Sequence, residues 1–260
     1  MKERLKAFLI HALISVLVLS ATLALVALVW YPAPLFWADG GREVIGLIAL
    51  VDMIIGPALT FVVYRKGKKS LKFDLSVIAV CQLAALAYGA TVMYQQRPVF
   101  VTFVLDRFYT VTAQQVETQA PRKLKDLAAL TPRASNWVYV RMPQDANALR
   151  QLFLGPNRGE LVLSLRTDLY APLLDENLPL IMTKASDINA LLKDSERKTR
   201  ERDRQVLANF LAEHRVAEDD IVFLPFIARY QQMFVAYRKS DARLIGFLEI
   251  QPDLFSGKPE

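Results

Sequence analysis

Residues 44–64 read VIGLIALVDMIIGPALTFVVY, an apolar run that contains one carboxylate, Asp52. A helix of about 20 apolar residues crosses the roughly 30 Å hydrocarbon core of a bilayer, so this run predicts a membrane span. On either side of it, Ala7–Trp30 and Leu75–Tyr94 have similar length and character. Three such runs favour a three-helix transmembrane region, residues 1–94, over the buried helices of a soluble protein.

The first run has a second interpretation, as a cleaved signal peptide. Its apolar part is longer than the 7–15 residues of a typical signal core, and Trp30-Tyr31-Pro32 is a poor cleavage site. We therefore expect an uncleaved membrane anchor.

Basic side chains are distributed unevenly around the three spans. Three precede the first span and five stand between the second and third, whereas residues 31–43, rich in proline and aromatic residues, contain only Arg42. Short cytoplasmic loops carry an excess of Lys and Arg. We therefore predict a multi-pass protein of a bacterial inner membrane, with its N-terminus in the cytoplasm and residues 95–260 in the periplasm. We expect the basic residues to attract anionic membrane lipid rather than nucleic acid. They are Lys2, Arg4, Lys6, Arg65, Lys66, Lys68, Lys69 and Lys72.

Asp52 is an ionisable residue at membrane depth, which is costly and typical of a residue that faces protein. Three interpretations stay open: a polar clamp between helices, a docking site for a polar group of a partner's membrane helix, and an ion path. At about 1.5 Å per residue, Asp52 lies about 18 Å from the cytoplasmic end of its span, Tyr88 and Ser20 about 20 Å, and His11 about 6 Å. This arithmetic predicts Tyr88 or Ser20, and not His11, as the hydrogen-bond partner of Asp52.

Small and helix-breaking residues mark the second and third spans. Proline removes a helical hydrogen bond and clashes one turn back, so Gly56-Pro57 predicts a kink. Ala85 and Gly89, four residues apart, predict a close contact between helices.

Residues 95–260 have the patterning of a mixed α/β periplasmic domain, and the fold class is α+β. Short runs of β-branched and aromatic residues predict strands, with turns at Asp106-Arg107 and Lys239–Ala242 and an antiparallel meander at the end. Apolar residues at helical spacing predict two helices, Asp145–Leu154 and Ser186–His214, the latter capped by Ser186. The predicted strands are Val99–Leu105, Phe108–Thr112, Asn136–Arg141, Ile221–Arg229, Tyr230–Arg238 and Arg243–Ile250.

The second predicted helix contains a charged segment, Lys193–Arg204. Balanced charges at helical spacing are typical of a solvated helix face. A surface that contacts another protein is the alternative.

The chain offers few residues for catalysis or metal binding. It has two histidines and one cysteine, which excludes a disulfide framework, a multi-cysteine zinc site and an iron–sulfur cluster within one chain. His11 and His214 have no neighbours at ligand spacing, and the sequence has no phosphate-binding glycine-rich loop. We therefore expect no metal, no cofactor and no enzymatic activity.

An ordered set of short motifs points to a family. The set comprises Trp30-Tyr31-Pro32, VDMIIGPALT at 51–60, KKSLKFDL at 68–75, Gln82, Ala87-Tyr88-Gly89, Arg97-Pro98 and Asp106-Arg107-Phe108. In this order, the motifs resemble those of the type IV pilin accessory proteins of the TfpX/TfpZ family. The resemblance is dense from about residue 1 to 112 and loose afterwards.

The resemblance implies an inner-membrane protein that assists assembly of its cognate type IV major pilin into surface pili, without catalysis. Its implied partners are that pilin, inner-membrane lipid and other pilus assembly proteins. Type IV pilins wait in the membrane as a long apolar N-terminal helix that carries an outer globular head. A protein with a membrane bundle and an outer domain can contact both parts.

These implications give a hypothesis for the functional residues. The bundle contacts the pilin helix while residues 97–260 recognise the pilin head, and three residues near the membrane exit fix the orientation of the outer domain. The proposed pilin-binding residues are Asp52, Gly56, Pro57 and Tyr88. The proposed orienting residues are Arg97, Asp106 and Arg107.

Two other classes of function remain as alternatives. One is a periplasmic sensor or signalling module that acts through a separate membrane partner, because the connection at 65–73 is too short for an output domain. The other is an enzyme acting on lipid-linked or peptidoglycan substrates.

Overall fold

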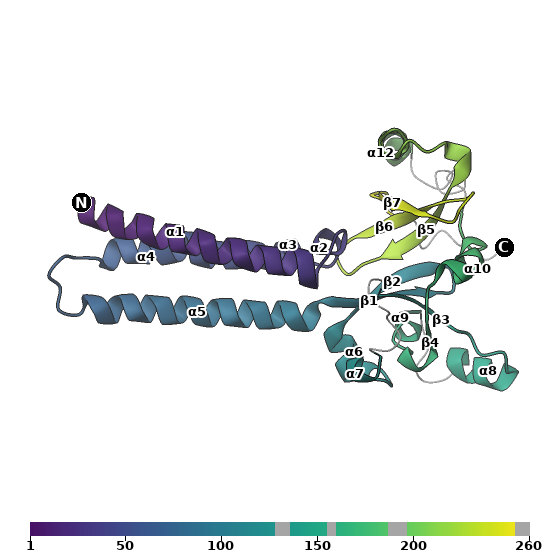
Figure 1. Ribbon diagram of the computed structural model, residues 1–260, viewed down its shortest axis with the longest axis horizontal. Coiled ribbons are helices and arrows are strands. Elements are labelled where there is room, and N and C mark those ends of the chain that lie inside the picture. Colours follow the sequence, from purple (N-terminus) through teal and green to yellow (C-terminus); the bar gives the residue numbers. More distant parts are fainter. Residues whose placement is uncertain (128–135, 155–159, 187–196, 253–260) are drawn as a thin grey trace. The chain divides into compact units, whose positions relative to one another are not determined.

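The computed structural model describes residues 1–127, 136–154, 160–186 and 197–252. It divides into two compact units, Met1–Arg97 and Pro98–Glu260, called the helical unit and the sheet unit below. The first is built of helices, and the second contains a seven-stranded sheet with helices packed on it (Figure 1).

Three long apolar helical stretches make up most of the helical unit, as the sequence predicts. Spanning Lys2–Trp30, Gly41–Val63 and Leu71–Gln96, they are long and apolar enough to cross a membrane. Their elements are α1 (Lys2–Leu25) with the π-helical η1 (Val26–Trp30), then α3 (Gly41–Ala49), the π-helical η2 (Leu50–Ile55) and α4 (Gly56–Val63), and finally α5 (Leu71–Gln96). The short α2 (Leu35–Ala38) lies between the first two stretches.

The π-helical segment η2 ends immediately before Gly56-Pro57, where the sequence predicts a kink. Pro57 has no N–H to offer the carbonyl one turn back. A π-helical turn is wider than an α-helical one and interrupts the regular hydrogen-bond ladder at that place. The second stretch therefore accommodates its proline within a continuous helical path.

Helix α4 packs against both α1 and α5 (Figure 1). Arg4 Nε on α1 donates to the Tyr64 carbonyl oxygen at the end of α4, at 2.9 Å. One turn further along α1, the rings of Phe8 and Phe61 meet edge to face, with centroids 6.3 Å apart. Positions rise along α1 as they fall along α4, so the two helices are antiparallel.

Glycines set the closest approaches to α5. A Cβ at Gly89 would lie 3.0 Å from Ile48 Cδ1 on α3, which confirms Gly89 as a site of close helix contact, whereas Ala85 is exposed. A Cβ at Gly56 would lie 2.0 Å from Nε2 of Gln82, which is closer than real Cβ contacts come. Gly56 therefore provides the space that the Gln82 side chain fills.

The far end of the helical unit is closed by aromatic side chains. The Tyr31 hydroxyl donates to the Met93 carbonyl oxygen at 3.1 Å, and both residues are buried. The rings of Trp30 and Tyr94 meet edge to face with centroids 5.4 Å apart. These contacts join the end of the first stretch to the end of α5.

The sheet unit contains a mixed sheet with the strand order β4-β3-β1-β2-β5-β6-β7. The pairs β1–β3 and β2–β5 are parallel, and the other neighbours are antiparallel. The predicted α+β class and the closing meander are confirmed. The strands are β1 (Pro98–Val104), β2 (Arg107–Thr112), β3 (Trp137–Val140), β4 (Tyr170–Pro172), β5 (Ile221–Ile227), β6 (Gln232–Arg238) and β7 (Leu244–Leu248).

Each of the six predicted strands is present, and β4 is an addition. Of the predicted helices, α8 (Ala146–Leu154) is confirmed, and α12 (Arg197–His214) is the described part of the second. Ser186 forms an isolated antiparallel bridge with Phe223, and residues 187–196 lie outside the described residues. The remaining helices within the described residues are α6 (Ala113–Gln119), α7 (Leu124–Leu127), α9 (Glu160–Leu163), α10 (Leu178–Met182) and the 3₁₀ turns η4 (Thr167–Leu169), η5 (Asp175–Asn177) and η6 (Glu218–Asp220).

Strand alternation gives the sheet two apolar faces. On one face, a core cluster packs strands β1 to β3 against α6 to α9, and a second packs β5 to β7 against α12. The other face is aromatic. The ring centroid of buried Phe108 lies 5.0 Å from that of Phe103 and 4.9 Å from that of Trp137. A local signal starts α6, where Thr112 and Gln115 form a reciprocal capping box.

The Gly56 contact yields a test of the helical packing. We expect Gly56→Ala to displace the Gln82 amide from Asp52 and to lower the stability of the full-length protein in detergent micelles by about 0.5–1.5 kcal/mol, the usual net contribution of one hydrogen bond. The control is Gly46→Ala, because nothing lies within 4 Å of a Cβ at that position. The measurement is the midpoint of thermal unfolding.

Shortening the Gln82 side chain should partly restore the stability that Gly56→Ala loses. We expect the Gly56→Ala, Gln82→Ala double variant to be less destabilised than the sum of the two single changes, the signature of contacting residues. Equal midpoints for Gly56→Ala and Gly46→Ala would contradict a stabilising role of the Gln82–Asp52 hydrogen bond.

Candidate functional site

Asp52 is buried in the helical unit and bonded across to α5. The residue is 5% exposed, and Gln82 Nε2 donates to Asp52 Oδ1 at 3.4 Å and to the Asp52 carbonyl oxygen at 3.5 Å. The prediction that Tyr88 or Ser20 is the partner is wrong, because both residues are exposed. Measured from the observed helix ends, Val63 of α4 and Leu71 of α5, Asp52 and Gln82 each lie about 16 Å along their helices. Measured from the predicted span start at Leu75, Gln82 lies only about 10 Å in, so the depth argument did not point to it.

The partner was also missed because depth fixes a position along a helix and not around it. An α-helix turns by about 100° per residue, so Tyr88 lies on the face of α5 opposite to Ala79, nine residues earlier. Ala79 is on the side of α5 that lines the same hollow as Asp52 and Gln82. Tyr88 is 75% exposed. The structure thus brings Asp52 and Gly56 together with Gln82, while Tyr88 lies apart from them.

A second polar pair joins α1 to α4. His11 Nδ1 lies 2.6 Å from Thr60 Oγ1, and Thr60 is buried. The sequence excluded His11 as the bonding partner of Asp52, and its recorded hydrogen bond is with Thr60 instead. Pro57, three residues before Thr60, is buried within the same bundle.

Two adjoining hollows lie between α1 and α5, with η2 and α4 between their walls. Their volumes are about 470 Å³ and 240 Å³, and both are lined by His11, Ile14 and Ala79. They therefore form one groove, called the α1–α5 groove below. Its lining includes His11 and Ile14 of α1, Asp52 of η2, Thr60 of α4, and Ala79 and Gln82 of α5.

The three residues predicted to orient the outer domain make local contacts. The guanidinium of Arg97 lies 3.7 Å from the centre of the Tyr94 ring and donates to the Tyr94 carbonyl oxygen, where a cation also suits the end of α5. Asp106 and Arg107 form a two-bond ion pair at 2.8 and 3.1 Å where the β1–β2 turn ends, which confirms the predicted turn. An orienting role for these residues stays a prediction.

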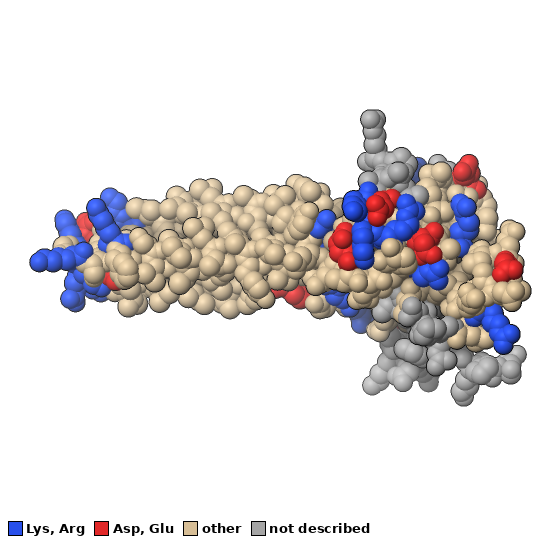
Figure 2. Space-filling model, turned by 90° about the horizontal axis from the view of Figure 1, so that it is seen from below, with Lys and Arg blue, Asp and Glu red and all other residues tan. Residues whose placement is uncertain are grey.

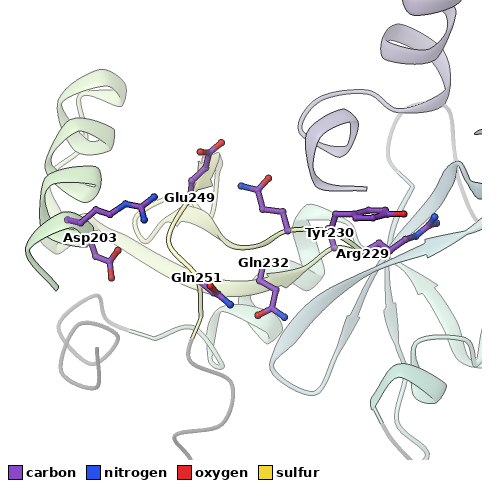
Figure 3. Close-up of a pocket in the computed structure, with 9 residues that line it drawn as sticks. Asp203, Arg229, Tyr230, Gln232, Glu249 and Gln251 are labelled. Carbon is purple, nitrogen blue, oxygen red and sulfur yellow. The ribbon is translucent and has the colours of Figure 1, made fainter. Parts of the chain in front are cut away.

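A polar pocket of about 380 Å³ lies in the sheet unit, beside α12 and the ends of β6 and β7. Figure 3 shows Asp203 of α12 on one side of it and Tyr230 with Arg229 on the other, with Gln232 and Glu249 between them. Asp203 is 9% exposed, and burial raises the pKa of its carboxyl. The sequence assigned Lys193–Arg204 to a solvated or contact surface, and Glu201, Arg202 and Arg204 are exposed, whereas packing of α12 on the sheet buries Asp203.

The described residues include no group of three or more His, Cys, Asp or Glu side chains placed to hold a metal ion. The lining of the polar pocket combines charged, amide and phenol groups. Such a lining can hydrogen-bond a polar ligand or a polar segment of a protein.

Comparison with known proteins finds three relatives from Dichelobacter nodosus. The chain is 39% identical over 100 residues to the fimbrial assembly protein of serogroup I and 39% identical over 99 residues to that of serogroup E1. These alignments cover 38% and 37% of this chain and 39% and 38% of the relatives. The chain thus spans about two fifths of the length of these two proteins.

The third relative is matched over most of its length. The fimbrial assembly protein of serogroups C1 and C2 is 38% identical over 99 residues, which are 37% of this chain and 76% of that protein. No protein-family model matches the chain. No solved structure matches it. Because the third alignment covers three quarters of the relative at this identity, the chain belongs to the family of these Dichelobacter nodosus fimbrial assembly proteins.

Proposed function

We propose that the protein assists assembly of type IV pili by non-catalytic contact with its cognate major pilin, as an accessory protein of the TfpX/TfpZ type. The observation that carries the proposal is the 38–39% identity with proteins named for fimbrial assembly. The three apolar helices support it, because a protein that meets a pilin before assembly has to work in the membrane. Inner-membrane lipid and other pilus assembly proteins complete the proposed surroundings.

The proposed orientation puts the N-terminus and the α4–α5 connection in the cytoplasm. Figure 2 shows Lys and Arg gathered at the end of the helical unit that holds both segments, and the rest of its visible surface is almost free of them. Because basic residues are retained on the cytoplasmic side, the sheet unit then lies in the periplasm.

Labelling of single cysteines in intact cells tests this orientation. Cys81 is first changed to serine, and a cysteine is placed at exposed Lys66 or exposed Glu213. We expect a membrane-impermeant maleimide to label Glu213→Cys in intact cells and Lys66→Cys only after lysis. The reverse pattern would show the opposite orientation.

Contact with the pilin is proposed at two places. The bundle around Asp52, Gly56 and Pro57 meets the apolar pilin helix, with Tyr88 as a further contact on the other face of α5. The sheet unit recognises the globular head. Buried Asp52 supports the first contact, because a carboxylate inside the membrane usually faces protein.

A clean deletion tests the proposed function. We expect the major pilin to fall in sheared surface filaments while the pool in whole cells persists, because the step that is lost is assembly and not synthesis. Immunoblots of the two fractions measure it, and the restored gene is the control. Unchanged surface pilin would refute the proposal and favour the periplasmic sensor.

Substitution of the buried carboxylate tests the membrane contact. We expect Asp52→Asn and Asp52→Leu to lower surface pilin by about tenfold, since a hydrogen bond to a charged group contributes about 1.5–3 kcal/mol. Levels of the accessory protein should stay normal. Exposed Glu43→Gln, in the same helical stretch, is the matched control.

If the Asp52 variants instead lose the accessory protein itself, Asp52 is a structural clamp and not a pilin contact. Immunoblots of the accessory protein in the same membranes separate the two results.

A further inference from the structure

The α1–α5 groove is apolar along its walls and polar at its base. The smaller hollow, of about 240 Å³, lies farther from the N-terminus and is called the deeper hollow below. Ile14, Leu83 and Leu86 line it, together with Asp52 and Gln82. Acyl chains of lipid cannot accept or donate hydrogen bonds, and a carboxylate that faces them is costly. A groove with this base is therefore better covered by protein than by lipid.

The shape of the groove suits one helix. Its lining on α5 runs from Leu75 to Leu86, which spans about 17 Å or three helical turns. Within the hydrocarbon region, a helix is the form in which a single segment satisfies all of its own backbone hydrogen bonds. An elongated groove of this length therefore fits a helix that runs beside α1 and α5.

The charge of the groove selects the chemistry of that helix. The lining of the deeper hollow includes the Asp52 carboxylate and no Lys or Arg. Its base therefore complements a hydrogen-bond donor, such as a hydroxyl, amide or amino group, on an otherwise apolar helix. Glu3 and Lys6 line the hollow nearer the N-terminus, where charges of either sign can be matched.

We infer that the α1–α5 groove binds one apolar membrane helix of a partner protein, which presents a hydrogen-bond donor to Asp52. The inference rests on the proposed function, under which the partner is the cognate major pilin. It assigns the groove contact to the side of α5 that carries Leu83 and Gln82, so the further contact proposed at Tyr88, on the other face, lies outside the groove.

Site-specific photo-crosslinking in living cells tests the inference. The photoreactive residue p-benzoylphenylalanine replaces one side chain of the full-length protein at a time, and adducts are detected with antibody against the major pilin. Two pairs of positions differ in direction, and their members lie about 3 Å apart along α1 and about 9 Å apart along α5. Leu83 and Ile14 line the groove, whereas Val77 on α5 and Val16 on α1 are exposed on other faces and line neither hollow.

We expect pilin adducts from Leu83 and Ile14 and only background from Val77 and Val16. Asp52→Leu should abolish the Leu83 adduct, while the exposed change Glu43→Gln leaves it intact. The two pairs lie on different helices, α5 and α1. If the photoreactive residue disturbs one of these helices, the pair on the other helix still gives a result.

Several outcomes would overturn the inference. Equal adducts from groove and control positions would show no preferred face. Adducts between two differently tagged copies of this protein would identify a second copy as the occupant, and adducts with lipid alone would identify lipid.

Failure of the inference and failure of the proposed function are distinguishable. If deletion lowers surface pilin and the groove positions give no pilin adduct, the function stands and the groove is not the contact. If deletion leaves surface pilin unchanged, the proposed function fails whatever the crosslinks show.

Discussion

The helical unit buries one carboxylate, Asp52, among apolar helices. In hydrocarbon, a polar group without a partner is costly, so Asp52 constrains everything around it. Gln82 reaches it from α5, and Gly56 provides the space for that side chain. The side of α5 that carries Gln82 faces the bundle, and Tyr88 lies on the exposed side.

The contacts of the central helical stretch with its two neighbours leave a groove between α1 and α5. Contacts with α4 hold α1 in place, through the Arg4–Tyr64 bond and the His11–Thr60 pair. Contacts of Gln82 with η2 hold α5 from the other side. Both outer helices are thus fixed to the central stretch, and the space between them is left to the two hollows.

The sequence predicted the length and number of the apolar helices because both follow from composition. It missed Gln82 as the partner of Asp52 for two reasons. Helix α5 begins at Leu71, four residues before the predicted span start, and rise per residue does not give the rotation around the axis, which depends on the neighbouring helix. Burial of Asp203 was also missed. Its helix is strongly charged in sequence, and the packing of α12 on the sheet decides which of its side chains is covered.

The strands were predicted because β-branched and aromatic runs are local signals, and the hairpins because turn residues join them. The parallel pairs β1–β3 and β2–β5 carry no such signal, because their partners lie far apart in the chain. The three-residue β4 is too short to show alternation. Helix α6 did have a signal, the capping-box spacing of Thr112 and Gln115.

The pairing of β2 with β5 has a consequence for how the protein is made. Strand β2 ends at Thr112 and β5 begins at Ile221, so the ribosome synthesises the whole intervening segment before the middle of the sheet can close. Until then, one edge of β2 presents unpaired backbone groups to any other strand nearby. A chain that ends before Ile221 keeps the unpaired edge of β2. Such fragments are prone to aggregation and are targets for quality-control proteases.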